Sequence, residues 1–261
     1  MRIGKQDAPF TAISTADAAS ITVRGRDLCN ELIGKIDFVD YFFLLLMGRE
    51  PDANQRFFVN ALLVAIAEHG LVPSVQAARM TYASGPEAVQ GAVAAGLLGS
   101  GSVVFGSGEA AGRFLHELVA ASAGKNARDV VIARIKDRRS RKEPIPGFGH
   151  PQHSGGDPRA NVLLKLAKER GLKGPYIEML YTIADALPEA LGRALPININ
   201  GAIPAILLEI GFPVTALKSI SILARTAGLL AHIQEEAERS IGFIISNAGA
   251  DAITYDGEKP G

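Results

Sequence analysis

The sequence predicts a mainly α-helical protein, and three observations carry that prediction. Apolar residues recur at helical spacing in segment after segment, and proline or glycine falls at the ends of these segments. The alternating pattern of half-buried strands is scarce and short. The chain has 261 residues, 48% of them apolar, so it can bury a sizeable core in one large domain or two small ones.

The N-terminal half is expected to begin irregularly and then to become helical. Residues 1–19 are polar and mixed, which predicts an extended arm, and residues 21–28 predict a short strand that leads into a helix near Asp27. Helices are expected over residues 38–47, 55–68, 73–83 and 86–98. Gly48 ends the first of them, and Pro73 and Pro86 begin the last two, as proline does at a first helical position.

The C-terminal half continues the helical pattern almost to its end. Helices are expected over residues 108–123, 127–138, 158–170, 175–191, 203–210 and 214–239. Asp157 and Pro158 provide a cap and a first helical residue for the third of these. From Ser246 onward the chain is rich in glycine and aspartate, which predicts an irregular tail.

Composition excludes several classes of protein. Basic and acidic residues balance at 27 each, so no net field favours nucleic acid or a membrane surface. The single cysteine, Cys29, cannot form an internal disulfide, and its apolar helical surroundings predict a core position rather than a nucleophile. No signal-peptide pattern begins the chain, and the longest apolar run is broken by glycines. We expect a soluble, cytoplasmic protein.

The loop at residues 144–150, Pro-Ile-Pro-Gly-Phe-Gly-His, is the strongest candidate for a site. Prolines and glycines keep its backbone out of a helix and open it to close approach, and a basic segment at residues 137–142 precedes it. His150 adds a ring that titrates near neutral pH, and Arg159 follows in a first helical turn. These features indicate a site for a large anionic ligand, with a plain surface loop as an equal alternative.

Three other patterns can be explained either by a functional site or by a structural role. His69 stands where a histidine can either bind a ligand or cap a helix, and Arg225 can bind an anion or pair with Glu235 on its own helix. The glycine-rich residues 94–110 lack the spacing of a dinucleotide loop and are better explained by close helix packing. His150, His153 and Asp157 are not arranged as zinc ligands, so no metal is expected.

Read together, five segments resemble the citrate synthase superfamily, which includes citryl-CoA lyases and the citryl-CoA-cleaving module of ATP-citrate lyase. They are residues 68–74, 94–110, 144–160, 195–201 and 222–232, and they occur in the family's order. The resemblance implies a two-lobed, nearly all-helical fold with a small domain inserted into a large one. On this pattern, residues 1–124 and 220–261 form the large domain and residues 125–219 the small domain, in a homodimer or higher homo-oligomer.

The resemblance also implies roles for individual residues. His150 would bind the oxygen that becomes the ketone of the oxo acid, and His69, Arg159 and Arg225 would hold carboxylates. The coenzyme A moiety would be taken by Arg141 or Lys142 and by the loop residues Ile145, Pro146, Gly147, Phe148 and Gly149. Phe105 stands at or next to the position of a histidine that polarises the thioester in synthases, and this departure favours the lyase branch.

Asn200 is the second departure from the family pattern. It occupies the position of an aspartate that moves a proton on the acetyl methyl group, and an amide can hydrogen-bond but cannot exchange a proton in that way. The leading hypothesis is a citryl-CoA lyase-like enzyme that cleaves or forms a C–C bond between oxaloacetate and acetyl-CoA. Its coenzyme A thioester is a substrate, and no covalent cofactor is expected. The alternatives are a catalytically silent protein that binds CoA esters or dicarboxylates, and an acyltransferase that condenses a different acyl-CoA.

Overall fold

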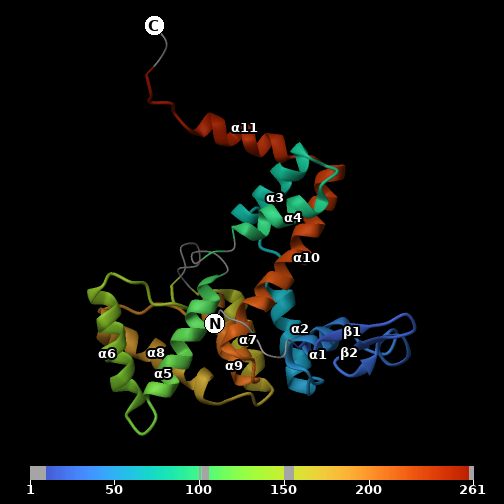
Figure 1. The fold of residues 1–261 in the computed structure, drawn as a ribbon. Coiled ribbons are helices and arrows are strands. Elements are labelled where there is room, and N and C mark those ends of the chain that lie inside the picture. The colour runs from blue at the N-terminus through green and yellow to red at the C-terminus, as the bar shows by residue number, and fades with distance from the viewer. Residues whose placement is uncertain (1–9, 100, 102–105, 150–155, 259–261) are drawn as a thin grey trace. The chain divides into compact units, whose positions relative to one another are not determined.

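The computed structural model describes residues 10–99, 101, 106–149 and 156–258, which are mainly helical (Figure 1). The prediction of a mainly α-helical protein is confirmed. The chain divides into two compact units, one up to residue 60 and one from residue 61 onward. The sequence-predicted domain boundaries at residues 124 and 219 stay a prediction.

The first unit contains a small antiparallel sheet that the sequence pattern did not reveal. Its strands are β1 (Ser14–Ala16), β2 (Ile21–Val23) and β3 (Arg26–Asp27), in the order β1-β2-β3. Thr15 pairs with Thr22 across the first two strands. The short strand predicted in residues 21–28 is confirmed by β2, whereas β1 and β3 were not predicted, because strands of two or three residues are too short to show a clear alternation. Residues 1–9 of the expected arm lie outside the described residues.

A π-helix and α1 complete the core of the first unit. The π-helix spans Leu28–Leu32, α1 spans Phe38–Met47, and α2 (Ala53–Ala67) starts in this unit. Val23, Leu32 and Leu44 form a buried cluster. The expectation that Cys29 is buried is wrong, since its side chain is exposed. Asp27 accepts hydrogen bonds from the backbone N–H groups of Cys29 and Asn30, and the turn that follows buries Leu32 instead.

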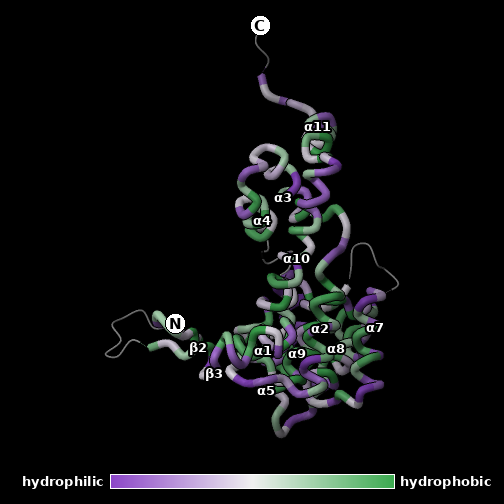
Figure 2. Tube along the Cα trace, turned by 90° about the vertical axis from the view of Figure 1, so that its right-hand side faces the viewer, coloured by the Kyte–Doolittle hydropathy of each residue, from purple (hydrophilic) through white to green (hydrophobic). Residues whose placement is uncertain are grey.

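The second unit is built from the remaining helices. They are α3 (Pro73–Ser84), α4 (Val89–Leu98), α5 (Gly106–Ala121), α6 (Ala127–Ser140), α7 (Pro158–Glu169), α8 (Pro175–Leu191), α9 (Ile199–Glu209), a 3-10 turn (Val214–Ala216), α10 (Leu217–Glu238) and α11 (Gly242–Ala252). Nearly every residue of α9 is buried, and α5, α7 and α8 pack against it. Hydrophobic colouring gathers where α8 and α9 pack (Figure 2).

Glycine permits the closest helix packing in this unit. A Cβ on Gly96 of α4 would lie 2.7 Å from a methyl group of Leu229 and 2.8 Å from the carbonyl oxygen of Ser74. Close packing, and not a phosphate loop, is therefore the role of this glycine, as the sequence indicated. Helix α10 contacts α3, α4 and α5. Among the described residues, only the segment Val214–Glu238 is long and apolar enough to cross a membrane, a test that buried core helices also pass.

Several helix boundaries differ from the sequence-based expectation. Helix α4 starts at Val89 rather than at Pro86, which lies in the turn before it. Helix α9 starts at residue 199 rather than 203, because the side chain of Asn198 accepts a hydrogen bond from the backbone N–H of Asn200. The tail expected to be irregular from Ser246 is helical to Ala252. Its start is fixed by Glu236, whose carboxylate accepts hydrogen bonds from the N–H groups of residues 241 and 242.

Gly112 provides a test of the packing between α5 and its neighbours. A Cβ there would meet the side chains of Leu217 and Pro204, whereas a Cβ on Gly249 of α11 would meet nothing within 4 Å. We expect Gly112→Ala to lower the free energy of unfolding by about 1–3 kcal/mol. Gly249→Ala should leave it unchanged or raise it by up to about 1 kcal/mol. Urea unfolding of both variants measures this, and equal effects would contradict the packing argument.

Candidate active site

The loop at residues 145–149 is joined to residues 196–198 by backbone hydrogen bonds. Phe148 pairs with Ile197 in an antiparallel bridge, the N–H of Gly149 donates to the carbonyl of Pro196 at 2.8 Å, and the N–H of Asn198 donates to that of Gly147 at 3.0 Å. The side-chain amide of Asn198 also donates to the carbonyl of Gly149 at 2.6 Å. The loop therefore has a fixed backbone, although it belongs to neither a helix nor an extended sheet.

Two glycines let this loop reach the start of α9. Gly147 has a φ of 87°, a conformation that favours glycine, and a Cβ on it would lie 2.8 Å from the Cα of Gly201. A Cβ on Gly201 would in turn lie 2.6 Å from the carbonyl oxygen of Gly147. Both contacts are between backbone atoms, which cannot move aside as a flexible side chain can. A side chain at either position would therefore displace the loop or the start of α9.

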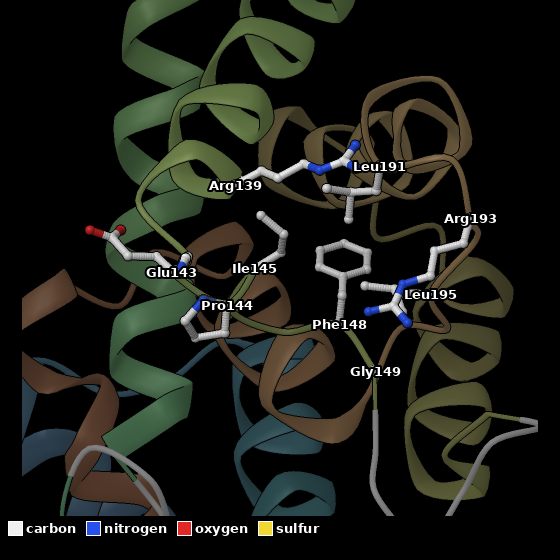
Figure 3. Close-up of a pocket in the computed structure, with 10 residues that line it drawn as sticks. Arg139, Glu143, Pro144, Ile145, Phe148, Gly149, Leu191, Arg193 and Leu195 are labelled. Atoms are coloured by element: carbon white, nitrogen blue, oxygen red, sulfur yellow. The ribbon is translucent and has the colours of Figure 1, made fainter.

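A cavity of about 610 Å³ opens beside the loop. Its lining residues are Arg139, Lys142, Glu143, Pro144, Ile145, Phe148, Gly149, Leu191, Arg193 and Leu195. Figure 3 shows the side chains of Phe148 and Leu191 between those of Arg139 and Arg193, with the Glu143 carboxylate directed away. Apolar side chains flanked by guanidinium groups suit a ligand that carries both an apolar part and anionic groups.

The predicted coenzyme A residues divide into two groups. Lys142, Ile145, Phe148 and Gly149 line the cavity, whereas Pro146 and Gly147 form the turn that supports it. Arg141 is not among the lining residues. Its guanidinium group pairs with the carboxylates of Asp137 at 2.8 Å and Glu143 at 3.4 Å.

The sequence analysis did not identify Arg139 or Arg193. Arg139 lies in the basic segment at residues 137–142, but nothing in that run distinguishes the residues that face the cavity. Arg193 follows Gly192, which ends α8 with a φ of 77°. Arg193 could have been proposed from the sequence, because it directly follows a glycine that ends a helix and lies close to the 195–201 segment.

Asp157 and Arg159 form a second part of the candidate site. The carboxylate of Asp157 is fully buried and accepts hydrogen bonds from the Arg159 guanidinium at 3.0 and 2.9 Å. It also accepts the N–H of Ile199 at 3.2 Å. Burial alone would raise the pKa of Asp157, but the bonds and charge of Arg159 outweigh it and hold this pKa below its usual value. Arg159 is therefore a fixed cation beside the start of α9.

Arg225 is a buried cation on α10. Its side chain is 4% exposed, and its guanidinium group donates to the carbonyl of Ile66 at 3.5 Å. Burial lowers the pKa of Arg225, the charge of Glu68 opposes that change, and the charge of Arg159 lowers it further. The two arginines are thus close enough to influence each other, and two neighbouring cations attract a dianionic ligand.

His69 lies beyond the last residue of α2, in an exposed turn. The Glu68 carboxylate accepts hydrogen bonds from the backbone N–H groups of His69, at 2.8 Å, and of Gly70. Gly70 has a φ of 72°, which favours glycine and turns the chain toward α3. The same Glu68 carboxylate influences Arg225, so the structure brings His69 and Arg225 into one neighbourhood.

Asn200 lies in the first turn of α9 and faces the first turn of α5. Its side-chain oxygen is 3.8 Å from the point where a Cβ on Gly108 would stand. Nearby in the sequence, the hydroxyl oxygen of Ser107 is buried and has no hydrogen-bond partner among the described residues. Two predicted site residues, His150 and Phe105, lie outside the described residues. Within the described ranges, no three His, Cys, Asp or Glu side chains are placed to hold a metal.

Comparison with known sequences identifies the family. The sequence model for the C-terminal domain of citrate synthase matches residues 35–245. The chain belongs to the citrate synthase family. Citrate synthase 2 of Bacillus subtilis (strain 168) is 28% identical over 202 residues, which are 76% of this chain and 52% of that protein. The chain therefore spans about half the length of the curated relatives that it matches.

Comparison with solved structures confirms the citrate synthase-like fold. Citryl-CoA lyase from Hydrogenobacter thermophilus matches with a TM-score of 0.85 and 32% identity, over 99% of this chain and 96% of that chain. ATP citrate lyase from Methanothrix soehngenii, solved in complex with citrate and coenzyme A, shares the fold with a TM-score of 0.77 and 21% identity. That match covers 98% of this chain and 43% of the ATP citrate lyase chain.

The buried pair of Asp157 and Arg159 predicts a pH-dependent stability. Because the pKa of Asp157 is below its usual 3.8 in the folded protein, its contribution is complete above about pH 5 and is lost as pH falls through the folded pKa. We expect Asp157→Asn to cost about 3 kcal/mol at pH 7, as breaking a buried ion pair does, and less below pH 4.

The control for this prediction is Glu169→Gln, at the other end of α7. Glu169 pairs with Lys165 at 3.6 Å on the surface, so its loss should change stability by no more than about 0.5 kcal/mol. Denaturant unfolding between pH 3 and pH 8 measures both variants. A cost of Asp157→Asn that stays constant across this range would contradict the assignment.

Proposed function

We propose that this protein is a citryl-CoA lyase-type enzyme, which breaks or makes the C–C bond between oxaloacetate, or a similar 2-oxo acid, and acetyl-CoA. The observation that carries the proposal is the match over nearly both whole chains to citryl-CoA lyase of Hydrogenobacter thermophilus. The cavity between Arg139 and Arg193 supports it, because its apolar and cationic lining suits a coenzyme A thioester.

In the direction of cleavage, the tertiary hydroxyl of citryl-CoA gives its proton to the imidazole that we assign to this oxygen, and the adjacent C–C bond breaks. The oxygen becomes the ketone of oxaloacetate, and the bonding electrons form the enolate of acetyl-CoA, which takes a proton at carbon. We assign the contact with the ketone oxygen to His150. Arg159, Arg225 and His69 are assigned to the carboxylates, since guanidinium groups bind carboxylates by paired hydrogen bonds.

The coenzyme A moiety is assigned to the cavity beside the 145–149 loop. Phe148 and Leu191 provide an apolar surface, and Arg139, Lys142 and Arg193 provide cations for its phosphate groups. Ile145 and Gly149 line this cavity, and Gly147 between them contacts Gly201 at the start of α9, next to Asn200. We place the thioester at that end of the loop, with Pro146 and Gly147 holding the turn.

The proton for the enolate is the unusual feature of this site. Asn200 occupies the position of a proton-carrying aspartate, and its amide can orient a group by hydrogen bonding but cannot deliver a proton. A solvent water that enters beside Asn200 is therefore assigned as the proton donor. Slow turnover of citryl-CoA follows from this assignment.

The proposal extends to assembly and location. A homodimer or higher homo-oligomer is supported by the exposed apolar side chains of α11, where Phe243 is 60% and Ile244 is 64% exposed. A cytoplasmic location is proposed from the sequence alone.

Asn200 also favours a second candidate function, a protein that binds CoA esters or dicarboxylates without turning them over. An acyltransferase for another acyl-CoA would keep the same fold and change both substrates. Incubation of the purified protein with synthetic citryl-CoA separates these functions, with oxaloacetate release followed through malate dehydrogenase and NADH. Turnover above the uncatalysed rate supports the lyase. No turnover, with CoA still bound in calorimetry, favours the binding protein or another acyl-CoA.

Restoring the carboxylate tests the role of Asn200 directly. We expect Asn200→Asp to raise citryl-CoA cleavage by about 10²–10⁴-fold, the range that a positioned acid or base contributes. The control is Asn198→Asp, which places the same charge two residues earlier at the cap of α9 and should not raise the rate. If Asn200→Asp leaves the rate unchanged, the assignment of this position is wrong.

Arg193 tests the location of the coenzyme A site. We expect Arg193→Ala to raise the Kd for CoA by about 10-fold, because a charge-assisted hydrogen bond to phosphate is lost. Arg128, which pairs with Glu189 on the surface, is the control arginine, and its change to alanine should leave the Kd unaltered. Arg141→Ala, measured alongside, shows whether Arg141 contributes as its sequence position suggests. Unchanged CoA binding in Arg193→Ala would exclude this cavity.

A further inference from the structure

His232 lies at the centre of a hydrogen-bond network that reaches the turn of His69. Its Nε2 atom is 2.9 Å from the Glu68 carboxylate, and its Nδ1 atom is 3.4 Å from a guanidinium nitrogen of Arg79. A guanidinium group can only donate, so Nδ1 is the acceptor and Nε2 carries the hydrogen that points to Glu68. The His232 side chain is only 15% exposed.

Arg79 is held firmly, so it can fix the ring of His232. Its side chain is almost fully buried and pairs with Glu236 at 2.6 Å and with Glu235 at 2.7 Å. Another of its nitrogens donates to the carbonyl of Arg239 at 3.1 Å. A buried guanidinium with this many partners has a single orientation.

Glu68 connects His232 to the backbone of His69 through hydrogen bonds. One carboxylate oxygen of Glu68 receives the hydrogen bond of His232, and the other accepts the backbone N–H groups of His69 and Gly70. Burial alone would raise the pKa of Glu68. The hydrogen bonds from His232 and from the two backbone N–H groups outweigh burial and lower this pKa, so the carboxylate stays ionised. Glu68 itself is about half exposed, and His232 donates a side-chain hydrogen bond that orients its carboxylate.

Close packing keeps α10 against this turn. A Cβ on Gly228 would collide with the carbonyl group of Ala67, the last residue of α2. Arg225 and His232 are seven residues apart on α10 and therefore lie on the same face as Gly228. One face of α10 thus carries a buried cation that donates to the carbonyl of Ile66 and a partly buried imidazole that bonds to Glu68.

We propose that His232, acting through Glu68, is a positioning residue that fixes the turn of His69 for binding the carboxylates of the oxo acid. The inference rests on the proposed function, in which His69 contacts that substrate. His232 does not touch the ligand. It orients the acceptor that holds the backbone of His69 and Gly70, and Arg79 in turn orients His232.

Calorimetry with oxaloacetate and with CoA tests this role in the full chain. We expect His232→Ala to raise the Kd for oxaloacetate by about 10-fold, as loss of a hydrogen bond to a charged group does, while the Kd for CoA stays within about 2-fold. His232→Gln keeps a donor near the position of Nε2 and should restore most of the affinity. Glu235→Gln removes another partner of Arg79 without touching Glu68, so it serves as the control for general loosening of the network.

A second measurement reports the turn itself. The amide chemical shifts of His69 and Gly70 reflect their hydrogen bonds to Glu68, and we expect both to move in His232→Ala but not in Glu235→Gln. If His232→Ala lowers the Tm yet leaves oxaloacetate binding and these shifts unchanged, His232 is only structural and the inference is overturned. If the wild-type protein binds no oxaloacetate, the proposed function fails and the amide shifts alone decide the positioning role.

Discussion

The close backbone contact between Gly147 and Gly201 is the constraint on which the candidate site depends. It allows the 145–149 loop to lie directly against the start of α9, where Asn198 bonds to the loop and caps the helix. Asp157 adds a buried carboxylate that bonds to the N–H of Ile199 and holds Arg159 beside the same helix end. The side chains of this region thus depend on a backbone arrangement that only glycine permits.

The helices were largely predictable, and the exceptions have specific causes. Regular apolar spacing located α1 to α8 and α10 to within a few residues. The start of α9 was missed because the cap of Asn198 sets it four residues before the expected residue 203. The helical tail was missed because Glu236, a carboxylate also paired with Arg79, fixes its first turn. Such a cap depends on tertiary structure, which a local pattern cannot show.

Short motifs predict some residues of the candidate site, whereas others are brought together only by the fold. Arg159, Arg225 and Asn200 were predicted from short segments, and their roles stay a prediction. The structure places Arg225 at the end of α2 and the other two at the start of α9. Arg139 and Arg193 are more than fifty residues apart, and only the packing of α6 and α8 brings them to one cavity. The two partners of His232, Glu68 and Arg79, likewise come from segments far from it in the sequence.

The cavity beside the loop has two walls that should differ in their capacity to evolve. The wall formed by Phe148 and Gly149 is tied to Ile197 and Pro196 through its backbone, so sequence change there disturbs the site as a whole. The opposite wall is formed by the side chains of Leu191, the last residue of α8, and of Arg193 and Leu195, which follow it. Selection for a different ligand of this cavity, in nature or in the laboratory, can therefore act on that second wall while the backbone of the first wall is retained.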